Sequence, residues 1–272
     1  MTHLNQYQSI LLDGDGVLWR ANDPIPGIKD FFDFLEDQGI KWALLTNNNT
    51  RTARDYVQKL RKFGIPADEH SVYTSSTVTA AYLLERFGAG AVLHAVGMDG
   101  LITTLEEAGF KVTSGEQTPA NSVAAVVAGM DRGINHQKIK IAMRLILEGA
   151  AFIATNTDGS FPTTEGINPG TGMVIGALQA TTGVVPYVAG KPHPAIFETA
   201  LEALHVPPQE TLMVGDRLET DILGANQLGI HTAAVLTGVT SRKEIQEKNI
   251  KPDVIYESIS ELLRDLKEVY QA

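Results

Sequence analysis

The sequence predicts an α/β fold built on a mainly parallel sheet. Its apolar runs are short and rich in β-branched residues, and they alternate with stretches of helical periodicity, which is the pattern of successive βα units. Several of these runs end directly in polar or glycine-rich turns. With 272 residues, the chain is long enough for one large domain or for two smaller domains with well-filled cores.

The elements follow from these patterns in chain order. In the first predicted helix, for example, Ile28, Phe31 and Leu35 fall on one face. The expected strands are Ser9–Leu12, Trp42–Thr46, Ala91–Val96, Val123–Ala128, Phe152–Ala154, Tyr187–Ala189, Thr211–Val214 and His231–Leu236. The expected helices are Gly27–Gln38, Arg51–Phe63, Thr77–Phe87, Gly100–Ala108, Asn135–Leu147, Met173–Thr181, Pro194–Leu204, Asp221–Leu228 and Ser258–Tyr270.

Two breaks in the series indicate domain boundaries. Gly88-Ala89-Gly90 interrupts the pattern after one helix, and Thr182-Gly183-Val184-Val185-Pro186 interrupts it before a later strand. We therefore expect a core formed by residues 1–88 and 185–272, with residues 89–184 inserted into it as a second domain.

Composition excludes several classes of function. The chain has no cysteine, so it offers no thiol nucleophile, disulfide framework or iron–sulfur cluster, and this suits a reducing compartment. Its formal net charge of −10 argues against a nucleic-acid polymer as partner. The N-terminal residues show no secretory signal, and no apolar run is long enough to span a membrane. We expect a cytoplasmic protein without a membrane partner.

The first strand ends in Asp13-Gly14-Asp15-Gly16, which is the strongest chemical signal in the chain. Open α/β sheets bind ligands at the carboxyl ends of their strands. Asp and Gly are also common turn residues, but a plain turn does not need two acids bracketed by apolar runs. An Asp can attack phosphorus as a nucleophile, and a second acid can protonate the leaving oxygen. Asp13 and Asp15 fit these two roles. Two carboxylates and a phosphate dianion repel one another, so the arrangement calls for a hard divalent cation such as Mg²⁺.

Two other strand ends could bind a phosphate. Thr46 is followed by Asn47 and Asn48, whose backbone amides at a helix start could hold phosphate oxygens, although Thr and Asn are also good helix caps. Lys191 follows a strand and precedes a proline, so it could supply a fixed positive charge. A surface lysine is the simpler alternative at that position.

A further strand ends in Gly215-Asp216, with Asp221 five residues later. Asp216 could donate a metal-binding oxygen, whereas Asp221 could order the loop or hold a metal-bound water. Helix capping explains Asp221 nearly as well. It does not explain Asp216, which follows an apolar strand and a glycine.

The order of these motifs resembles that of the haloacid dehalogenase-like (HAD) hydrolase superfamily. The succession is Asp-x-Asp-Gly, a strand ending in Thr-Asn, then Gly-Lys-Pro, then Gly-Asp-x3-Thr-Asp. The segments DGDGVLW, LTNNNTRT and TNTDGSFPTTEGINPGTG are similar to those of subfamily IIA, the NagD-like or 4-nitrophenylphosphatase type. The resemblance implies a Rossmann-like parallel sheet core, with residues 89–184 as an inserted α/β cap of the C2 type.

The same resemblance implies a role for each acid. Asp13 would be the nucleophile and a magnesium ligand, and Asp15 the general acid and base with its main-chain oxygen on the metal. Asp216 would complete the Mg²⁺ site, and Asp221 would support it from outside.

The remaining motif residues would bind substrate. Thr46, the amide of Asn47, and Asn48 would hold the transferring phosphoryl group, while Lys191 would neutralise it and orient the nucleophile. Thr157 departs from the family, where many relatives have proline, and this puts substrate choice in doubt.

The predicted activity is hydrolysis of a small phosphorylated metabolite, such as a sugar phosphate, a nucleotide or phosphoglycolate. The loop Asn156–Asn168 is a candidate for selecting the leaving group. Caps of this branch often take part in dimer contacts, so a homodimer is one expectation.

Two alternatives belong to other classes of function. A non-catalytic phosphate-binding module on the same scaffold would bind esters without releasing phosphate. A dinucleotide-dependent oxidoreductase lacks its fingerprint, because Trp19 stands where the third glycine belongs.

Overall fold

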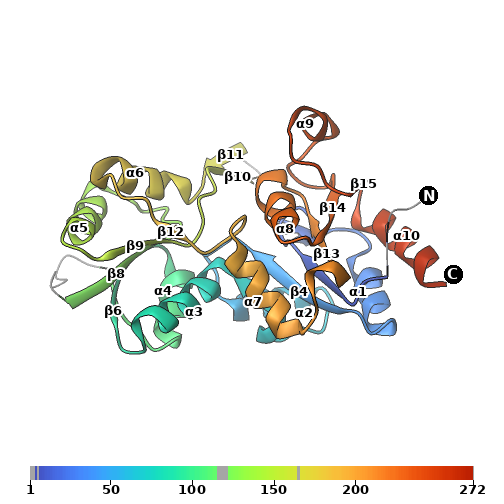
Figure 1. Ribbon diagram of the computed structural model, residues 1–272, viewed down its shortest axis with the longest axis horizontal. Coiled ribbons are helices and arrows are strands. Elements are labelled where there is room, and N and C mark those ends of the chain that lie inside the picture. The colour runs from blue at the N-terminus through green and yellow to red at the C-terminus, as the bar shows by residue number, and fades with distance from the viewer. Residues whose placement is uncertain (1–3, 5, 115–121, 164–165, 272) are drawn as a thin grey trace. The chain divides into compact units, whose positions relative to one another are not determined.

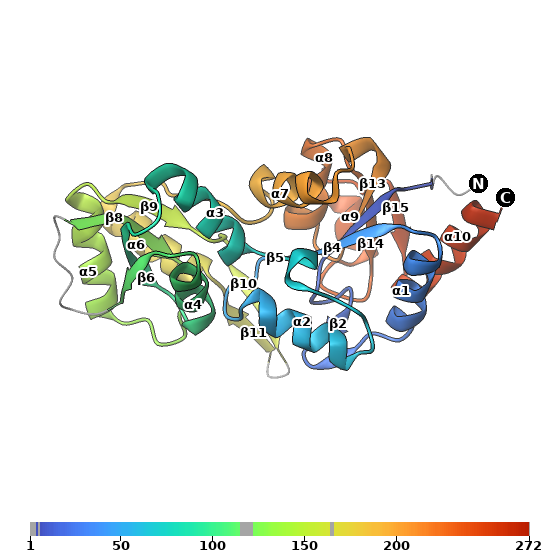
Figure 2. The same ribbon diagram turned by 90° about the horizontal axis from the view of Figure 1, so that it is seen from below.

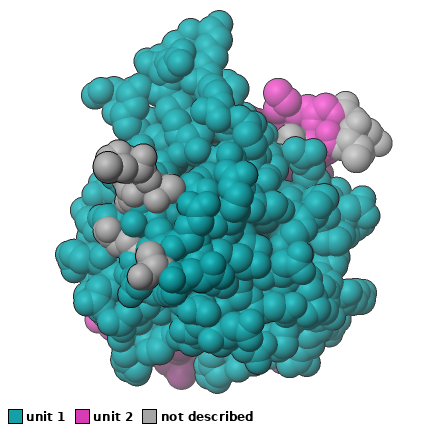
Figure 3. Space-filling model, turned by 90° about the vertical axis from the view of Figure 1, so that its right-hand side faces the viewer, with its two compact units in different colours: residues 1–46, 56–73, 191–272 teal, residues 47–55, 74–190 magenta. Residues whose placement is uncertain are grey.

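The computed structural model describes residues 4, 6–114, 122–163 and 166–271. It divides into two compact units, which Figure 3 distinguishes by colour. Unit 1 comprises residues 1–46, 56–73 and 191–272, and unit 2 comprises residues 47–55 and 74–190. Unit 2 is thus made of two segments inserted into the chain of unit 1.

Among the described residues, unit 1 contains a six-stranded sheet in the order β15-β14-β13-β1-β4-β5. Its strands are β1 (Ser9–Leu12), β4 (Lys41–Thr46), β5 (Val72–Thr74), β13 (Thr211–Gly215), β14 (His231–Val235) and β15 (Val254–Tyr256). The central strand β1 is buried throughout and pairs in parallel with β13 and β4, so that Leu12 lies between Val214 and Leu44. The carboxyl ends of these three strands therefore meet at one edge, beside the point where the strand order reverses.

Helices cover the sheet of unit 1. They are α1 (Ile28–Asp37), most of α2 (Ala53–Lys62), α7 (Pro194–Leu204), α8 (Leu223–Gln227), α9 (Arg242–Glu247) and α10 (Ile259–Gln271). Helix α1 buries Ile28, Phe31 and Leu35, the face that its periodicity predicts, and packs beside α10 (Figure 1). Pro194 begins α7, where its fixed φ suits the first helical position.

Unit 2 has its own parallel sheet, in the order β12-β9-β8-β6-β7 among the described residues. Its strands are β6 (Val92–Val96), β7 (Lys111–Thr113), β8 (Val123–Ala128), β9 (Ala151–Ala154) and β12 (Tyr187–Val188). The pair α3 (Ser75–Phe87) and α4 (Asp99–Glu107) covers one face, and the pair α5 (His136–Leu147) and α6 (Gly172–Thr182) covers the other (Figure 1). Successive side chains of strand β9 point to opposite faces of the sheet, because Phe152 packs in one apolar cluster and Ile153 in the other.

The predicted strands and helices all appear, several with identical bounds. The sequence prediction missed β5, β7, β15, α9 and two hairpins, which are β2 (Trp19–Arg20) with β3 (Asp23–Pro24), and β10 (Ser160–Thr163) with β11 (Gly166–Pro169) (Figure 2). These elements are two to six residues long, too short for a periodic pattern to stand out.

The observed division differs from the boundaries expected at residues 88 and 184. Strand β12 pairs with β9 and so extends the sheet of unit 2. Helix α3 also belongs to unit 2, because Ala80 and Leu83 pack in the cluster that contains Leu93. Within the described part of the chain, none of the helices has the length and apolar character needed to cross a membrane.

Candidate active site

Asp13 stands directly after β1, at the carboxyl edge of the sheet in unit 1. Its backbone N–H donates to the carbonyl of Val214 at 3.0 Å, which continues the pairing with β13 for one residue beyond the strand. Its side chain is 13% exposed, so one carboxylate remains accessible at the end of a buried strand. Burial raises the pKa of Asp13 well above its usual value, and the nearby Asp221 and Asp216 raise it further, while Lys191 opposes them.

Lys191 is almost fully buried, and its ammonium group faces Asp13. The Nζ atom lies 2.6 Å from Asp13 Oδ1 and 2.7 Å from Asp221 Oδ1, and it also donates to the carbonyl of Leu45 at 2.8 Å. Burial alone would lower the pKa of Lys191, but the two carboxylates outweigh it and raise the pKa above its ordinary value. The surface-lysine alternative is therefore wrong, because this ammonium group is held inside the site.

Asp216 follows β13 and is also buried. Its Oδ2 accepts a hydrogen bond from the N–H of Val239 at 2.7 Å. The backbone of Gly238 comes so close that a Cβ there would lie 1.8 Å from the same oxygen. Burial, followed by the charge of Asp221, raises the pKa of Asp216 to about 7.

Asp221 lies in a π-helical turn, Leu218–Ile222, that leads into α8. Its Oδ2 accepts a hydrogen bond from the N–H of Arg217 at 3.1 Å, which orders the loop after β13. A Cβ on Gly215 would lie 2.2 Å from the Cβ of Asp221, so this turn also packs tightly against the strand end. The expected loop-ordering contact is thus present, and the carboxylate pairs with Lys191 in addition.

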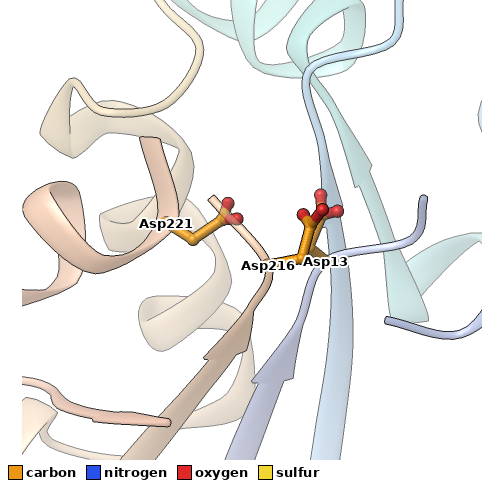
Figure 4. Close-up of side chains that lie close together, drawn as sticks. All are labelled: Asp13, Asp216 and Asp221. Atoms are coloured by element: carbon orange, nitrogen blue, oxygen red, sulfur yellow. The ribbon is translucent and has the colours of Figure 1, made fainter. Parts of the chain in front are cut away.

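Asp13, Asp216 and Asp221 form one acidic group. Each offers an oxygen, and these oxygens lie within 4.8 Å of one another. Figure 4 shows Asp13 and Asp216 side by side, with the carboxylate of Asp221 pointing toward them. With all three carboxylates ionised, the single positive charge of Lys191 leaves the group an excess of two formal negative charges. Hard carboxylate oxygens with an uncompensated charge of this size fit a divalent metal ion.

Asp15 differs from the other acids because its side chain is exposed. Its Oδ1 accepts a hydrogen bond from Nε1 of Trp19 at 3.0 Å. The family resemblance implies only the main-chain oxygen of Asp15 in the metal site, and its carboxylate is not among the three that cluster.

The chain passes from unit 1 to unit 2 within the segment predicted to bind phosphate. Thr46 ends β4 in unit 1 and is buried, whereas Asn47 and Asn48 belong to unit 2. The Asn48 side chain accepts hydrogen bonds from the N–H and hydroxyl of Thr50, which is a local turn contact.

Asn47 is held by several residues of unit 2. Its carbonyl accepts hydrogen bonds from Ser75 Oγ at 2.8 Å and from Asn156 Nδ2 at 2.7 Å. Its own side-chain amide donates to both carboxylate oxygens of Asp158. These contacts fix the orientation of the Asn47–Asn48 peptide, whose N–H belongs to Asn48.

Three neighbours of the predicted site residues make contacts that the sequence does not indicate. Trp19 ends the DGDGVLW segment that carries the family resemblance, but nothing there indicates its contact with Asp15, and Ser75 has no sequence signal. Asn156 begins the loop predicted to select the leaving group, but its contact with Asn47 joins segments more than a hundred residues apart. Residues 164–165 of that predicted loop lie outside the described residues.

Comparisons with known proteins identify the family of this chain. A haloacid dehalogenase-like hydrolase family model matches residues 10–111, and a second HAD-hydrolase-like model matches residues 188–262. The acid sugar phosphatase of Staphylococcus aureus (strain USA300) is 37% identical over 265 residues, which cover 97% of this chain and all of that protein.

Solved structures of the same type are similar over nearly their whole length. The p-nitrophenyl phosphatase from Archaeoglobus fulgidus has a TM-score of 0.89 and 32% identity, covering 96% of this chain and 99% of its own. NagD from E. coli K-12 has a TM-score of 0.83 and 33% identity, covering 94% and 98%. The predicted α/β fold and the predicted enzyme class are thereby confirmed. The chain belongs to the haloacid dehalogenase-like hydrolase superfamily, in its NagD-like branch of phosphatases.

Proposed function

We propose that this phosphatase hydrolyses phosphate monoesters of small metabolites with Mg²⁺, through a phosphoryl group carried on Asp13. The observation that carries the proposal is the contact between Asp13 and the buried Lys191 at the end of β1. The ammonium group favours the ionised, nucleophilic form of the carboxylate, against a burial effect that favours the neutral form.

Asp13 and Asp216, with the main-chain oxygen of Asp15, would hold the Mg²⁺ ion, and Asp221 would support it. Oxygen ligands of this kind suit Mg²⁺, and the excess negative charge of the acidic group is of the size that a divalent cation neutralises. When bound, the ion would polarise the phosphoryl group and screen it from the carboxylates.

The reaction would proceed in two displacements. In the first, an Asp13 oxygen forms a bond to phosphorus while the bond to the leaving oxygen breaks, and Asp15 donates a proton to that oxygen. In the second, water attacks the phosphorus, Asp15 takes a proton from it, and orthophosphate leaves Asp13 as a carboxylate. Throughout, Thr46, Asn47, Asn48 and Lys191 would bind the phosphoryl oxygens, which carry the negative charge of the transition state.

Substrate choice would depend on unit 2, acting as a cap, and on its loop Asn156–Asn168. Such a cap excludes bulk water and contacts the leaving group. The relative from S. aureus is named an acid sugar phosphatase, so sugar phosphates are the first substrate class to test. The absence of cysteine suits the reducing cytoplasm, where we place the enzyme.

Asp13→Asn tests the proposed nucleophile. We expect the variant to lose at least about a thousandfold in kcat with 4-nitrophenyl phosphate and Mg²⁺, because an amide oxygen cannot form the phosphoryl-enzyme. Wild-type protein quenched in acid during turnover should carry one phosphoryl group on the peptide containing Asp13, and hydroxylamine should remove it. Asp33→Asn, on the exposed face of α1, is the matched control. Near wild-type turnover by Asp13→Asn would refute the assignment.

Metal removal tests the proposed cofactor. Dialysis against EDTA should abolish turnover, and added Mg²⁺ should restore it. Asp216→Asn should need a much higher Mg²⁺ concentration, because the ion would lose one of its carboxylates. Full activity of the EDTA-treated enzyme would contradict the proposed Mg²⁺ dependence.

A further inference from the structure

Trp19 is a fully buried aromatic residue whose one polar atom contacts an exposed carboxylate. Its side chain has 0% exposure, and the indole N–H, the only donor of that ring, donates to Asp15 Oδ1 at 3.0 Å. A buried indole N–H usually finds a hydrogen-bond partner. Here the partner is the side chain proposed as general acid and base.

Neighbouring residues fix the indole ring in place. Tyr56 of α2 stacks on it, with ring centroids 5.9 Å apart and planes inclined by 19°. The Lys59 ammonium lies 3.9 Å from the ring centroid and donates to the carbonyl of Ala21. Gly14 leaves room for the ring, because a Cβ at that position would lie 2.4 Å from it. The donor therefore has one well-defined position.

Backbone hydrogen bonds form a turn around Asp15. The N–H of Gly16 donates to the carbonyl of Trp19 at 2.8 Å, and the N–H of Trp19 donates to the carbonyl of Gly14 at 3.2 Å. The main chain on both sides of Asp15 is thus tied to the residue that also binds its carboxylate. An exposed aspartate without such a contact would sample several rotamers, and the alignment needed for proton transfer would be lost for part of the time.

We propose that Trp19 is a positioning residue for Asp15, holding its carboxylate in the orientation that delivers a proton to the leaving oxygen. The proposal rests on the general-acid role assigned to Asp15 above. Trp19 itself touches neither substrate nor metal in this scheme. Its contribution should be largest for esters whose leaving group depends most on that proton.

Two aryl phosphates of similar size separate positioning from a purely structural role. Phenolate is a more basic leaving group than 4-nitrophenolate, so phenyl phosphate depends more on the general acid than 4-nitrophenyl phosphate does. For Trp19→Phe, which keeps an aromatic ring without the donor, we expect kcat/KM to fall about tenfold with phenyl phosphate and about twofold with 4-nitrophenyl phosphate. Competitive inhibition by inorganic phosphate should be unchanged, because the phosphate-binding groups are intact.

Replacement of Trp19 by β-(3-benzothienyl)alanine separates the donor from the ring, because sulfur takes the place of N–H while the shape is retained. It should reproduce the selective loss of Trp19→Phe, even if the smaller Phe side chain also disturbs packing. The matched control is Trp42→Phe, the same substitution at the other tryptophan, which packs against Phe32. That variant should treat both substrates as the wild type does.

The Asp15→Asn variant distinguishes failure of the acid role of Asp15 from failure of the positioning role of Trp19. Suppose that Asp15→Asn loses activity preferentially with phenyl phosphate. If kcat/KM of both Trp19 variants then decreases equally for the two substrates, or does not decrease, the positioning role is refuted and the proposed mechanism stands. If Asp15→Asn keeps its activity on phenyl phosphate, the acid role fails and the inference about Trp19 fails with it.

Discussion

Lys191→Met would remove the ammonium group from the buried ion pairs while keeping a side chain of similar length. Asp13 and Asp221 lie 2.6 and 2.7 Å from that group, and the lysine side chain is 2% exposed. Removing one partner of a buried ion pair costs about 3–5 kcal/mol, because the remaining charge is left uncompensated. For a protein of this size, we expect the melting temperature in EDTA to fall by roughly 6–20 °C.

The assay is thermal unfolding of wild type and variant in EDTA and in saturating Mg²⁺. A cation bound by the acidic group would replace part of the lost positive charge, so Mg²⁺ should stabilise Lys191→Met more than it stabilises the wild type. Lys29→Met is the matched control, since Lys29 has the same 2.6 Å contact with Asp33 on the surface, and its melting temperature should not change. A loss of less than about 2 °C for Lys191→Met in EDTA, or equal stabilisation of both proteins by Mg²⁺, would refute the electrostatic reasoning.

Two further predictions concern unit 2. Asn156→Ala should raise KM for 4-nitrophenyl phosphate about fivefold and lower the melting temperature by roughly 2–4 °C, because the carbonyl of Asn47 loses one hydrogen bond of about 1 kcal/mol. An unchanged KM in steady-state kinetics would contradict this. His94 is 1% exposed on β6, and burial lowers its pKa to about 4, so the folded state resists a proton that the unfolded chain accepts near pH 6.5. The contribution of His94 to the free energy of unfolding should therefore be fully present above about pH 6.5 and be lost as the pH drops toward 4. At pH 4.5 the loss should be about 2–3 kcal/mol. In urea unfolding experiments, the free energy of unfolding should decrease less at low pH for His94→Asn than for the wild type. An equal decrease in both proteins would contradict the assignment of this effect to His94.

The sequence predicts those parts of the fold whose signal is local. Strand β1 and helix α7 have the expected bounds, because one is an apolar run that stops at an acid and the other begins at a proline. The strand ends at Asp13, Thr46 and Asp216 could likewise be predicted, because parallel strands bring their carboxyl ends to one edge.

What could not be predicted depends on contacts between distant segments. The pairing of Lys191 with Asp221 as well as Asp13 requires the turn after β13 to fold back on the strand end, and in the sequence helix capping explains Asp221 nearly as well. The assignment of β12 to unit 2 depends on its pairing with β9, and nothing in its few residues indicates a partner.

The close approach of Gly238 to Asp216, and of Gly215 to Asp221, limits which residues can stand at these two glycine positions. In each place the distance between main chain and carboxylate is shorter than a methyl group allows. A side chain at position 215 or 238 would therefore have to displace Asp221 or Asp216 from the acidic group. The positions of these two acids thus depend on the absence of a side chain at both glycines.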